Sequence, residues 1–166
     1  MAASLAALVN PFSPTAEAQT RELRAGAQAL GVQLHVLHAS SGGELDSVFA
    51  TVVQLKSGGL VIAADAVFNT RVEQIAALAL QYAVPTAFLF REFAAAGGLI
   101  SYGGSIGEAY RLAGSYIGRI LKGERPADLP VQQATRIELI INMKTAKALG
   151  LSFPLTLLGR ADEVIE

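Results

Sequence analysis

The chain has 166 residues, the size of one compact domain. Hydrophobic residues make up 52% and charged residues only 16%, a composition that can bury a large core and excludes intrinsic disorder. Thirteen basic against fourteen acidic side chains, with no basic cluster, argue against a nucleic-acid-binding protein. The absence of cysteine excludes disulfides and thiolate chemistry, and two histidines are too few for a histidine-rich metal centre. We therefore expect no metal, no cofactor and no nucleic-acid partner.

The N-terminal nine residues are apolar, but they lack the basic start and the cleavage site of a secretion signal. No run approaches the 18 apolar residues that would predict a membrane span. The run Leu5–Val9 ends at the turn pair Asn10-Pro11, and a short apolar run closed in this way predicts a buried strand. The chain thus opens directly on a core strand.

The first hundred residues alternate between apolar strands and amphipathic helices. The run Leu60–Ala63 is continuously apolar, which is typical of a parallel strand covered on both faces. Such alternation indicates βαβ units around a parallel sheet. The predicted strands cover residues 5–9, 32–37, 60–63, 85–90 and 99–102, and the predicted helices cover 15–30, 45–55 and 69–82.

The last third has a different pattern. A long helix over 108–122 carries apolar residues on one broad face, and Gly123 to Pro126 ends it. An extended linker over 127–131, a strand over 137–141, a short helix over 143–149 capped by Asn142, and an extended or helical tail follow. One long helix and one strand are too little for a separate domain, so this part must pack on something else.

In an open parallel sheet, ligands bind at the carboxyl ends of the strands, near the point where the strand order reverses. The segments that follow the predicted strands are therefore where polar and aromatic groups matter most. They are Asn10 to Thr15 at a helix N-terminus, His38 with Ser40 and Ser41, Ala64 to Asn69, Arg91 to Phe93, and Tyr102 to Ser105.

Each of these groups also has a purely structural role open to it. Asn10-Pro11 is a good turn, Ser13 or Thr15 could cap the next helix, and Asp65 could cap the helix after it. Phe68 is of a residue type that more often packs in a core than against a ligand. The sequence alone leaves these alternatives open.

The motifs of common enzymes are absent. There is no phosphate-binding P-loop, no dinucleotide fingerprint after the first strand and no nucleophile elbow. Asp65 and Glu92 are the best carboxylates at strand ends, but neither has an acidic neighbour. A carboxylate, small polar groups and aromatic rings suit holding a small zwitterion better than transforming it. We expect a binding protein and not an enzyme.

Several stretches, taken in order, resemble the ABC transporter substrate-binding family that includes tryptophan- and tyrosine-binding proteins. The resemblance covers nearly the whole chain. It rests on Asn10-Pro11-x-x-Pro14, Leu34-His35-Val36-Leu37, Ala64-Asp65-x-x-Phe68-Asn69, REFxxxGGLxSYG (residues 91–103), GRILKGERPADLPVQ (118–132) and INxKTAKALGL (141–151).

The resemblance implies a type I periplasmic-binding-protein fold, in which two α/β lobes close on a ligand. Members of the family are roughly twice as long as this chain, which matches their second half. The implied organisation is a flavodoxin-like three-layer αβα lobe over residues 1–104, and a crossover helix, strand and tail over 105–166 that in the family pack partly on the first lobe. Without that lobe, this second part must fold back, exchange with another copy or expose an apolar patch. We therefore expect a homodimer, with swapped C-terminal segments as one form of it.

The resemblance also implies a ligand, a site and a partner. The ligand class is amino acids, often aromatic, bound without chemical conversion, and the partner is an ABC permease at an extracytoplasmic location. Asp65 would pair with the ligand ammonium, Ser13 and the first helix would receive its carboxylate, and a ring would stack on its side chain. The implied binding residues are Asn10, Ser13, Asp65, Phe68, Asn69, Glu92 and Tyr102.

Three other interpretations remain at this stage. The lobe could be a stand-alone sensory or regulatory domain with a flavodoxin-like fold, or a truncated remnant without a function of its own. It could also be a small α/β enzyme that uses Asp65 or His38, although the missing enzyme motifs disfavour this.

Overall fold

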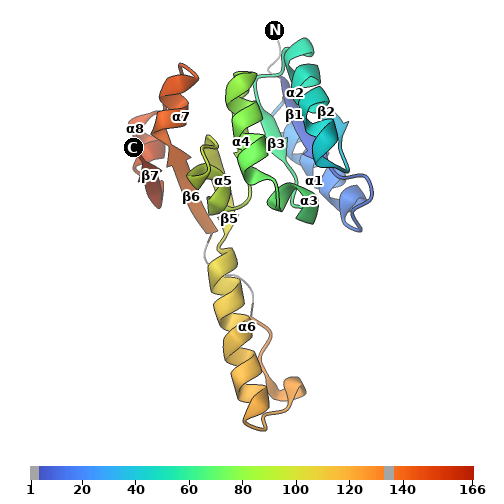
Figure 1. Cartoon of the computed structure of the whole chain (residues 1–166), viewed down its shortest axis with the longest axis vertical. Helices are drawn as coiled ribbons and strands as arrows, with labels where there is room; N and C mark the ends of the chain where they lie inside the picture. The colour runs from blue at the N-terminus through green and yellow to red at the C-terminus, as the bar shows by residue number, and fades with distance from the viewer. Residues whose placement is uncertain (1–3, 133–136) are drawn as a thin grey trace.

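The computed structural model describes residues 4–132 and 137–166, and the described strands form one seven-stranded sheet in the order β2-β1-β3-β4-β5-β6-β7 (Figure 1). Neighbouring strands from β2 to β5 are parallel, β6 is antiparallel to β5, and β7 is parallel to β6. The strands are β1 (Ser4–Val9), β2 (Gln33–His38), β3 (Leu60–Ile62), β4 (Thr86–Phe88), β5 (Ile100–Gly104), β6 (Ile137–Asn142) and β7 (Glu163–Ile165).

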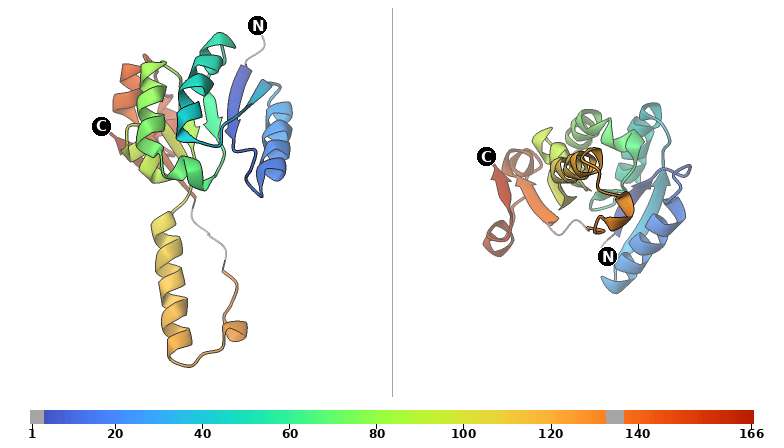
Figure 2. Two further views of the ribbon diagram at one scale, coloured as in Figure 1. Left: turned by 45° about the vertical axis from the view of Figure 1, so that its right-hand side comes forward. Right: turned by 90° about the horizontal axis from the view of Figure 1, so that it is seen from below.

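Helices cover both faces of the sheet, so the lobe has three layers (Figure 2). Helix α1 lies on one face beside β1 and β2, and α2, α4 and α5 lie on the other. The helices and helical turns are α1 (Ala16–Ala29), η1 (Gly42–Glu44), α2 (Leu45–Gln54), α3 (Ala66–Asn69), α4 (Val72–Gln81), α5 (Arg91–Ala95), α6 (Ile106–Leu121), η2 (Pro126–Asp128), α7 (Met143–Ala148) and α8 (Leu155–Leu158).

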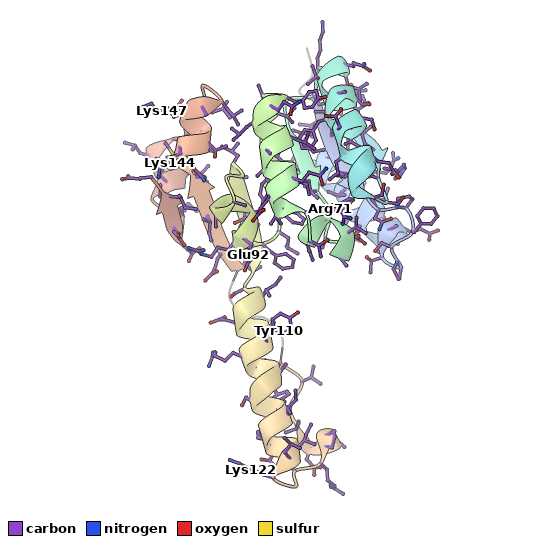
Figure 3. The ribbon with its side chains drawn as sticks, in the orientation of Figure 1. Arg71, Glu92, Tyr110, Lys122, Lys144 and Lys147 are labelled. Atoms are coloured by element: carbon purple, nitrogen blue, oxygen red, sulfur yellow. The ribbon has the colours of Figure 1, made fainter. Side chains whose placement is uncertain are left out.

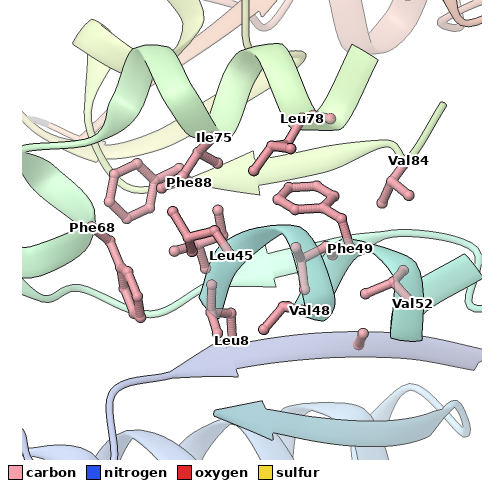
Figure 4. Close-up of a cluster of buried hydrophobic side chains, with 14 of the residues drawn as sticks. Leu8, Leu45, Val48, Phe49, Val52, Phe68, Ile75, Leu78, Val84 and Phe88 are labelled. Carbon is pink, nitrogen blue, oxygen red and sulfur yellow. The ribbon is translucent and has the colours of Figure 1, made fainter. Parts of the chain in front are cut away.

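The main core lies between the sheet and the layer formed by α2, α4 and α5 (Figure 4). Strand β1 sends Ala6 and Leu8 into it, and α2 covers them with an apolar stripe that includes Phe49, which has no exposed surface. Because side chains alternate along a strand, Leu5 points to the opposite face, which α1 covers only in part. The two faces of the sheet are therefore unequally packed.

The C-terminal segment joins the same sheet. Strand β6 pairs along its length with β5, and the buried Asn142 at its end accepts from the Thr145 amide at 3.1 Å, as an N-cap of α7. The Asn142 side chain also donates to the carbonyl of Ala94 at 2.9 Å, and the Thr145 hydroxyl donates to the carbonyl of Gly97 at 2.8 Å. These bonds anchor α7 to α5 and to the loop after it.

Helix α6 leaves the body of the lobe at the carboxyl end of β5 and extends away from it (Figure 1). The Ser105 hydroxyl caps it by accepting from the Glu108 amide, yet no residue of this helix is buried. The Tyr116 hydroxyl donates to the Pro130 carbonyl at 2.6 Å, in the described part of the linker that follows the helix (residues 122–132), which we call the return linker.

The predicted α/β class and the alternation of strands and helices are confirmed, with shifts at element ends. The helix expected over 69–82 is α4, which begins three residues later than predicted, and a separate short helix that was not predicted, α3, capped by Asp65, precedes it. The short helix α5 was not predicted, since Arg91 to Phe93 were interpreted only as a strand end. The expected cap of Asn142 on the following helix is present.

Candidate functional site

The order β2-β1-β3 reverses the direction of strand addition at β1, so the crevice between the ends of β1 and β3 is the switch point where open α/β sheets bind ligands. Asn10 follows β1 and Asp65 follows β3. The Asn10 side-chain amide donates to Asp65 Oδ1 at 3.0 Å, so the structure brings these two predicted site residues into direct contact.

Asp65 is fixed by one of its two carboxylate oxygens. Oδ1 accepts from Asn10 and from the amide of Val67 at 2.8 Å, and the second bond makes Asp65 the N-cap of α3. Among the described residues, Oδ2 has no hydrogen-bond partner, and the side chain is only half-buried. The structural role of Asp65 and a ligand-binding role are therefore compatible, because they use different oxygens.

Asn10 holds the loop that follows β1. Its side-chain oxygen accepts from the Phe12 amide at 3.0 Å, and only 7% of its surface is exposed. Both ends of its amide are thus engaged within the lobe. Asn10 therefore positions Asp65 and the loop, whereas a direct ligand contact would require it to exchange one of these bonds.

The loop leads into α1, whose first turn lies beside the same crevice. The Gln19 side chain donates to the Ala64 carbonyl at 2.8 Å, which holds α1 against the segment that carries Asp65. The Ser13 hydroxyl lies 3.1 Å from that of Thr15, and Thr15 makes no side-chain cap. Among the described residues, the amides of Glu17 and Ala18 have no hydrogen-bond partner, so this helix end offers free donors.

Aromatic side chains at this edge divide into exposed and buried ones. Tyr102 on β5 is 62% exposed, and Phe12 in the loop after β1 is 81% exposed. Phe68, in contrast, has no exposed surface and packs in the main core. In this conformation Phe68 offers a ligand no surface to stack on, because the third side chain of α3 turns inward to cover the sheet. Phe12 was not predicted as a site residue. Its position in a loop between two prolines is a signal that could have identified it, because an aromatic ring there has no core to pack in.

The two remaining predicted residues lie at the same edge. Glu92 is an exposed residue in the first turn of α5 (Figure 3), which follows β4. Asn69 ends α3, and its side-chain Oδ1 is buried without a hydrogen-bond partner among the described residues. The structure joins neither of them to Asp65 by a hydrogen bond.

His38 ends β2, which lies on the other side of β1 from the strand that Asp65 follows. It lines a depression of about 660 Å³ with Pro11, Arg21 and Arg24 of the neighbouring loop and α1. None of the described residues forms a group of three metal-ligating side chains, and none of the described helices is long and apolar enough to cross a membrane.

A doubly wound lobe with its polar groups at the switch point is the architecture of a periplasmic-binding-protein lobe. Residues 2–165 match the family model described as ABC transporter substrate binding protein. The chain therefore belongs to the ABC transporter substrate-binding protein family, as its motifs suggested.

Solved structures agree with this fold. A conserved domain protein from Vibrio cholerae O1 biovar El Tor has a TM-score of 0.86 at 24% identity, over 97% of this chain and 54% of that one. An ABC domain in complex with L-Trp from Streptococcus pneumonia has a TM-score of 0.84 at 24% identity, over 98% and 56%. A ligand-free, open substrate-binding protein with adhesive properties from Clostridium difficile has a TM-score of 0.70 at 20% identity, over 99% of this chain and 55% of that one.

The chain thus spans about half the length of the solved structures that it resembles. No curated protein gives a significant match.

Proposed function

We propose that this chain is a ligand-binding lobe of an ABC-type uptake system and holds a small amino-acid-like ligand without converting it. The single observation that carries the proposal is the Asp65 carboxylate at the switch point, with Oδ1 fixed by two hydrogen bonds and Oδ2 free among the described residues. A carboxylate that is fixed in place but keeps one open oxygen is a suitable partner for a ligand ammonium, because little side-chain freedom is lost on binding.

The rest of the crevice suits the other parts of an amino acid. The Ser13 hydroxyl and the free amides of α1 are donors for a carboxylate, and the helix dipole favours negative charge there. The exposed ring of Phe12, in the loop after β1, is available to stack on an apolar or aromatic side chain, and the exposed ring of Tyr102 lies on β5, two strands beyond β3. An aromatic amino acid is the ligand we favour, and the structurally similar pneumococcal ABC domain, solved in complex with L-Trp, supports this choice.

Two further parts of the proposal follow from the family. The lobe would act in an extracytoplasmic compartment and deliver its ligand to an ABC permease, as substrate-binding proteins of this family do. Because Asp65 is only half-buried and the neighbouring loop exposes the Phe12 ring, the crevice is open to solvent and offers a ligand one wall. The monomeric lobe is therefore expected to bind weakly or not at all in calorimetry.

The test replaces Asp65 by Asn, which keeps an oxygen to accept from Asn10 and Val67 but removes the charge. L-tryptophan is titrated into the protein at millimolar concentrations, and amide chemical shifts are followed by NMR. A charge-assisted hydrogen bond contributes about 1.5–3 kcal/mol, so Asp65→Asn should weaken binding by roughly 10- to 100-fold. Asp46→Asn, on α2, removes an equal charge from a carboxylate that accepts from the Tyr82 hydroxyl and not from Asn10 or Val67, and is the matched control.

The ligand itself supplies a second control. Indole-3-propionate lacks the amino group, so it should bind the unmodified lobe no better than L-tryptophan binds Asp65→Asn. Equal binding of the two ligands, or tryptophan-induced shifts that leave Asp65 and Val67 unmoved, would refute the assignment of this crevice.

A further inference from the structure

Helix α6 exposes a continuous apolar stripe. Positions 106, 110, 113, 117 and 120/121 recur at helical spacing and fall on one side of the helix. Along this stripe Tyr110 (labelled in Figure 3) is 75% exposed, Ile117 57% and Leu121 82%. Tyr116, which contacts the return linker, lies off this stripe. The described part of the lobe therefore leaves one whole apolar face of its longest helix without a partner.

The sheet face that carries α1 has a matching apolar surface. A groove of about 700 Å³ runs between α1 and the sheet, and a second depression of about 180 Å³ continues over β3, β4 and β5. Both are lined by Leu5 and Val61, so they form one surface, which we call the open sheet face. Its further lining includes Ala87 and Ile100, both half-buried. The residues that line the depression over β3, β4 and β5 come from strands and from the loops beside them, and none comes from a described helix.

One polar atom at the border of the open sheet face also lacks a partner. Gln19 lines the groove, and its Oε1 is buried with no hydrogen-bond partner among the described residues. Buried acceptors are normally satisfied in native proteins. An unsatisfied buried acceptor beside a large exposed apolar area indicates a surface that another structural element covers.

The chain's own α6 does not lie on its open sheet face. The pairing of Gly104 with Ile137 fixes both ends of the segment between β5 and β6 at the carboxyl edge of the sheet, and α6 extends from that edge away from the body (Figure 1). A second copy presents the same two surfaces. A two-fold arrangement in which each copy's α6 enters the other's open sheet face would use both.

We propose that two copies of this chain form a reciprocal dimer in which α6 of each copy packs on the open sheet face of the other. The exposed side chains of the stripe each bury on the order of 100 Å², and with the groove surfaces they cover, the two contacts reach on the order of 1,500 Å². This is the standard size of a stable protein interface.

The dimer also bears on the ligand site. Because each α6 starts at the carboxyl edge of its own sheet, the exchange brings the two carboxyl edges toward each other. Each Asp65 crevice, which is a single wall in the monomer, then gains a second wall from the partner copy. This second point rests on the proposed function, whereas the dimer itself does not.

The first experiment measures mass in solution by light scattering on the full chain, without ligand, over a concentration series. Ile117→Asp places a charge in the middle of the apolar stripe and should raise the dimer dissociation constant at least tenfold. Ser115→Asp places the same charge on the opposite side of α6 and should leave it unchanged. Circular dichroism checks that both variants remain folded, as expected for residues that are exposed in the monomer.

The second experiment maps the contact. The chain has no cysteine, so Ile117→Cys and Ala87→Cys can be made as single variants and mixed with a short bismaleimide cross-linker. The mixture should give cross-linked heterodimers, and the double variant should form intermolecular and not intramolecular links. A sharp monomer at all concentrations, or a dimer that Ile117→Asp does not weaken, would overturn the proposal.

The two proposals fail in different ways. A dimer with the expected cross-links that ignores L-tryptophan would refute the ligand assignment alone. A monomer that binds L-tryptophan through Asp65 would refute the reciprocal dimer alone.

Discussion

Asn10 offers the sharpest test of how the crevice is held, because its two hydrogen bonds can be removed together or separately. Asn10→Ala removes the donor to the Asp65 carboxylate and the acceptor for the Phe12 amide, both at 3.0 Å. A bond to a charged group contributes about 1.5–3 kcal/mol and a neutral one about 0.5–1.5 kcal/mol. Since Asp65 is only half-buried and water can replace part of the first bond, we expect a loss of about 2–3 kcal/mol.

Asn10→Asp keeps the acceptor for Phe12 but places a second carboxylate beside Asp65. Two like charges about 4 Å apart repel by about 4 kcal/mol at an effective dielectric constant of about 20. This repulsion raises the folded pKa of the pair above the value of about 3.9 for an unfolded aspartate. When the folded pKa of a carboxyl is raised, the free energy of unfolding falls as pH rises from about 4 through that folded pKa. Above the folded pKa the free energy of unfolding no longer changes with pH.

The assay is urea unfolding of the unmodified chain, Asn10→Ala and Asn10→Asp between about pH 4 and about pH 8, at one protein concentration. Asn10→Asp should approach the unmodified chain at the acid end and be less stable than Asn10→Ala at the alkaline end. The Asn10→Ala difference should change little over the same range. The reasoning is refuted if Asn10→Asp shows no more pH dependence than Asn10→Ala, or if Asn10→Ala costs less than about 0.5 kcal/mol.

Two further predictions concern other parts of the lobe. Asn142→Ala removes the cap of α7 and a buried bond to α5, so it should cost about 2–3 kcal/mol in urea unfolding, whereas the exposed Lys144→Ala should cost little. An equal effect of both would show that the anchor is unimportant. The Ser40 amide and the Ser41 hydroxyl lower the pKa of the exposed Glu44, so its stabilising effect is present above about pH 4.3 and is lost as pH falls through the lowered pKa. Ser41→Ala should raise that pKa in an NMR carboxyl titration, and an unchanged value would contradict the assignment.

The strands and long helices of the first hundred residues were predictable because each carries its own periodicity. Leu60–Ile62 reads as a buried strand without any knowledge of its neighbours. The short helix α5 was not predictable in this way, since five residues carry too little pattern. It is held by the cover it gives to β5 and by the buried Phe93.

The candidate site was predictable only as a set of positions. The rule that ligands bind at strand ends selects Asn10 and Asp65, and the structure adds that they are bonded to each other. The rule gives no way to tell that Phe68 turns into the core while Phe12 stays exposed, because both follow strand ends and both are aromatic. That distinction depends on which face of α3 meets the sheet, which is a property of tertiary packing.

The antiparallel pairing of β5 with β6 has a consequence for how α6 can change over time. The pairing closes a loop over residues 105–136, and the entropy cost of closing a loop grows only with the logarithm of its length. Doubling the loop would cost only about 0.6 kcal/mol. Since no residue of α6 is buried in the lobe, its length and sequence are nearly free of the demands of folding. Substitutions in α6 can therefore change what the helix binds without lowering the stability of the sheet from which it extends.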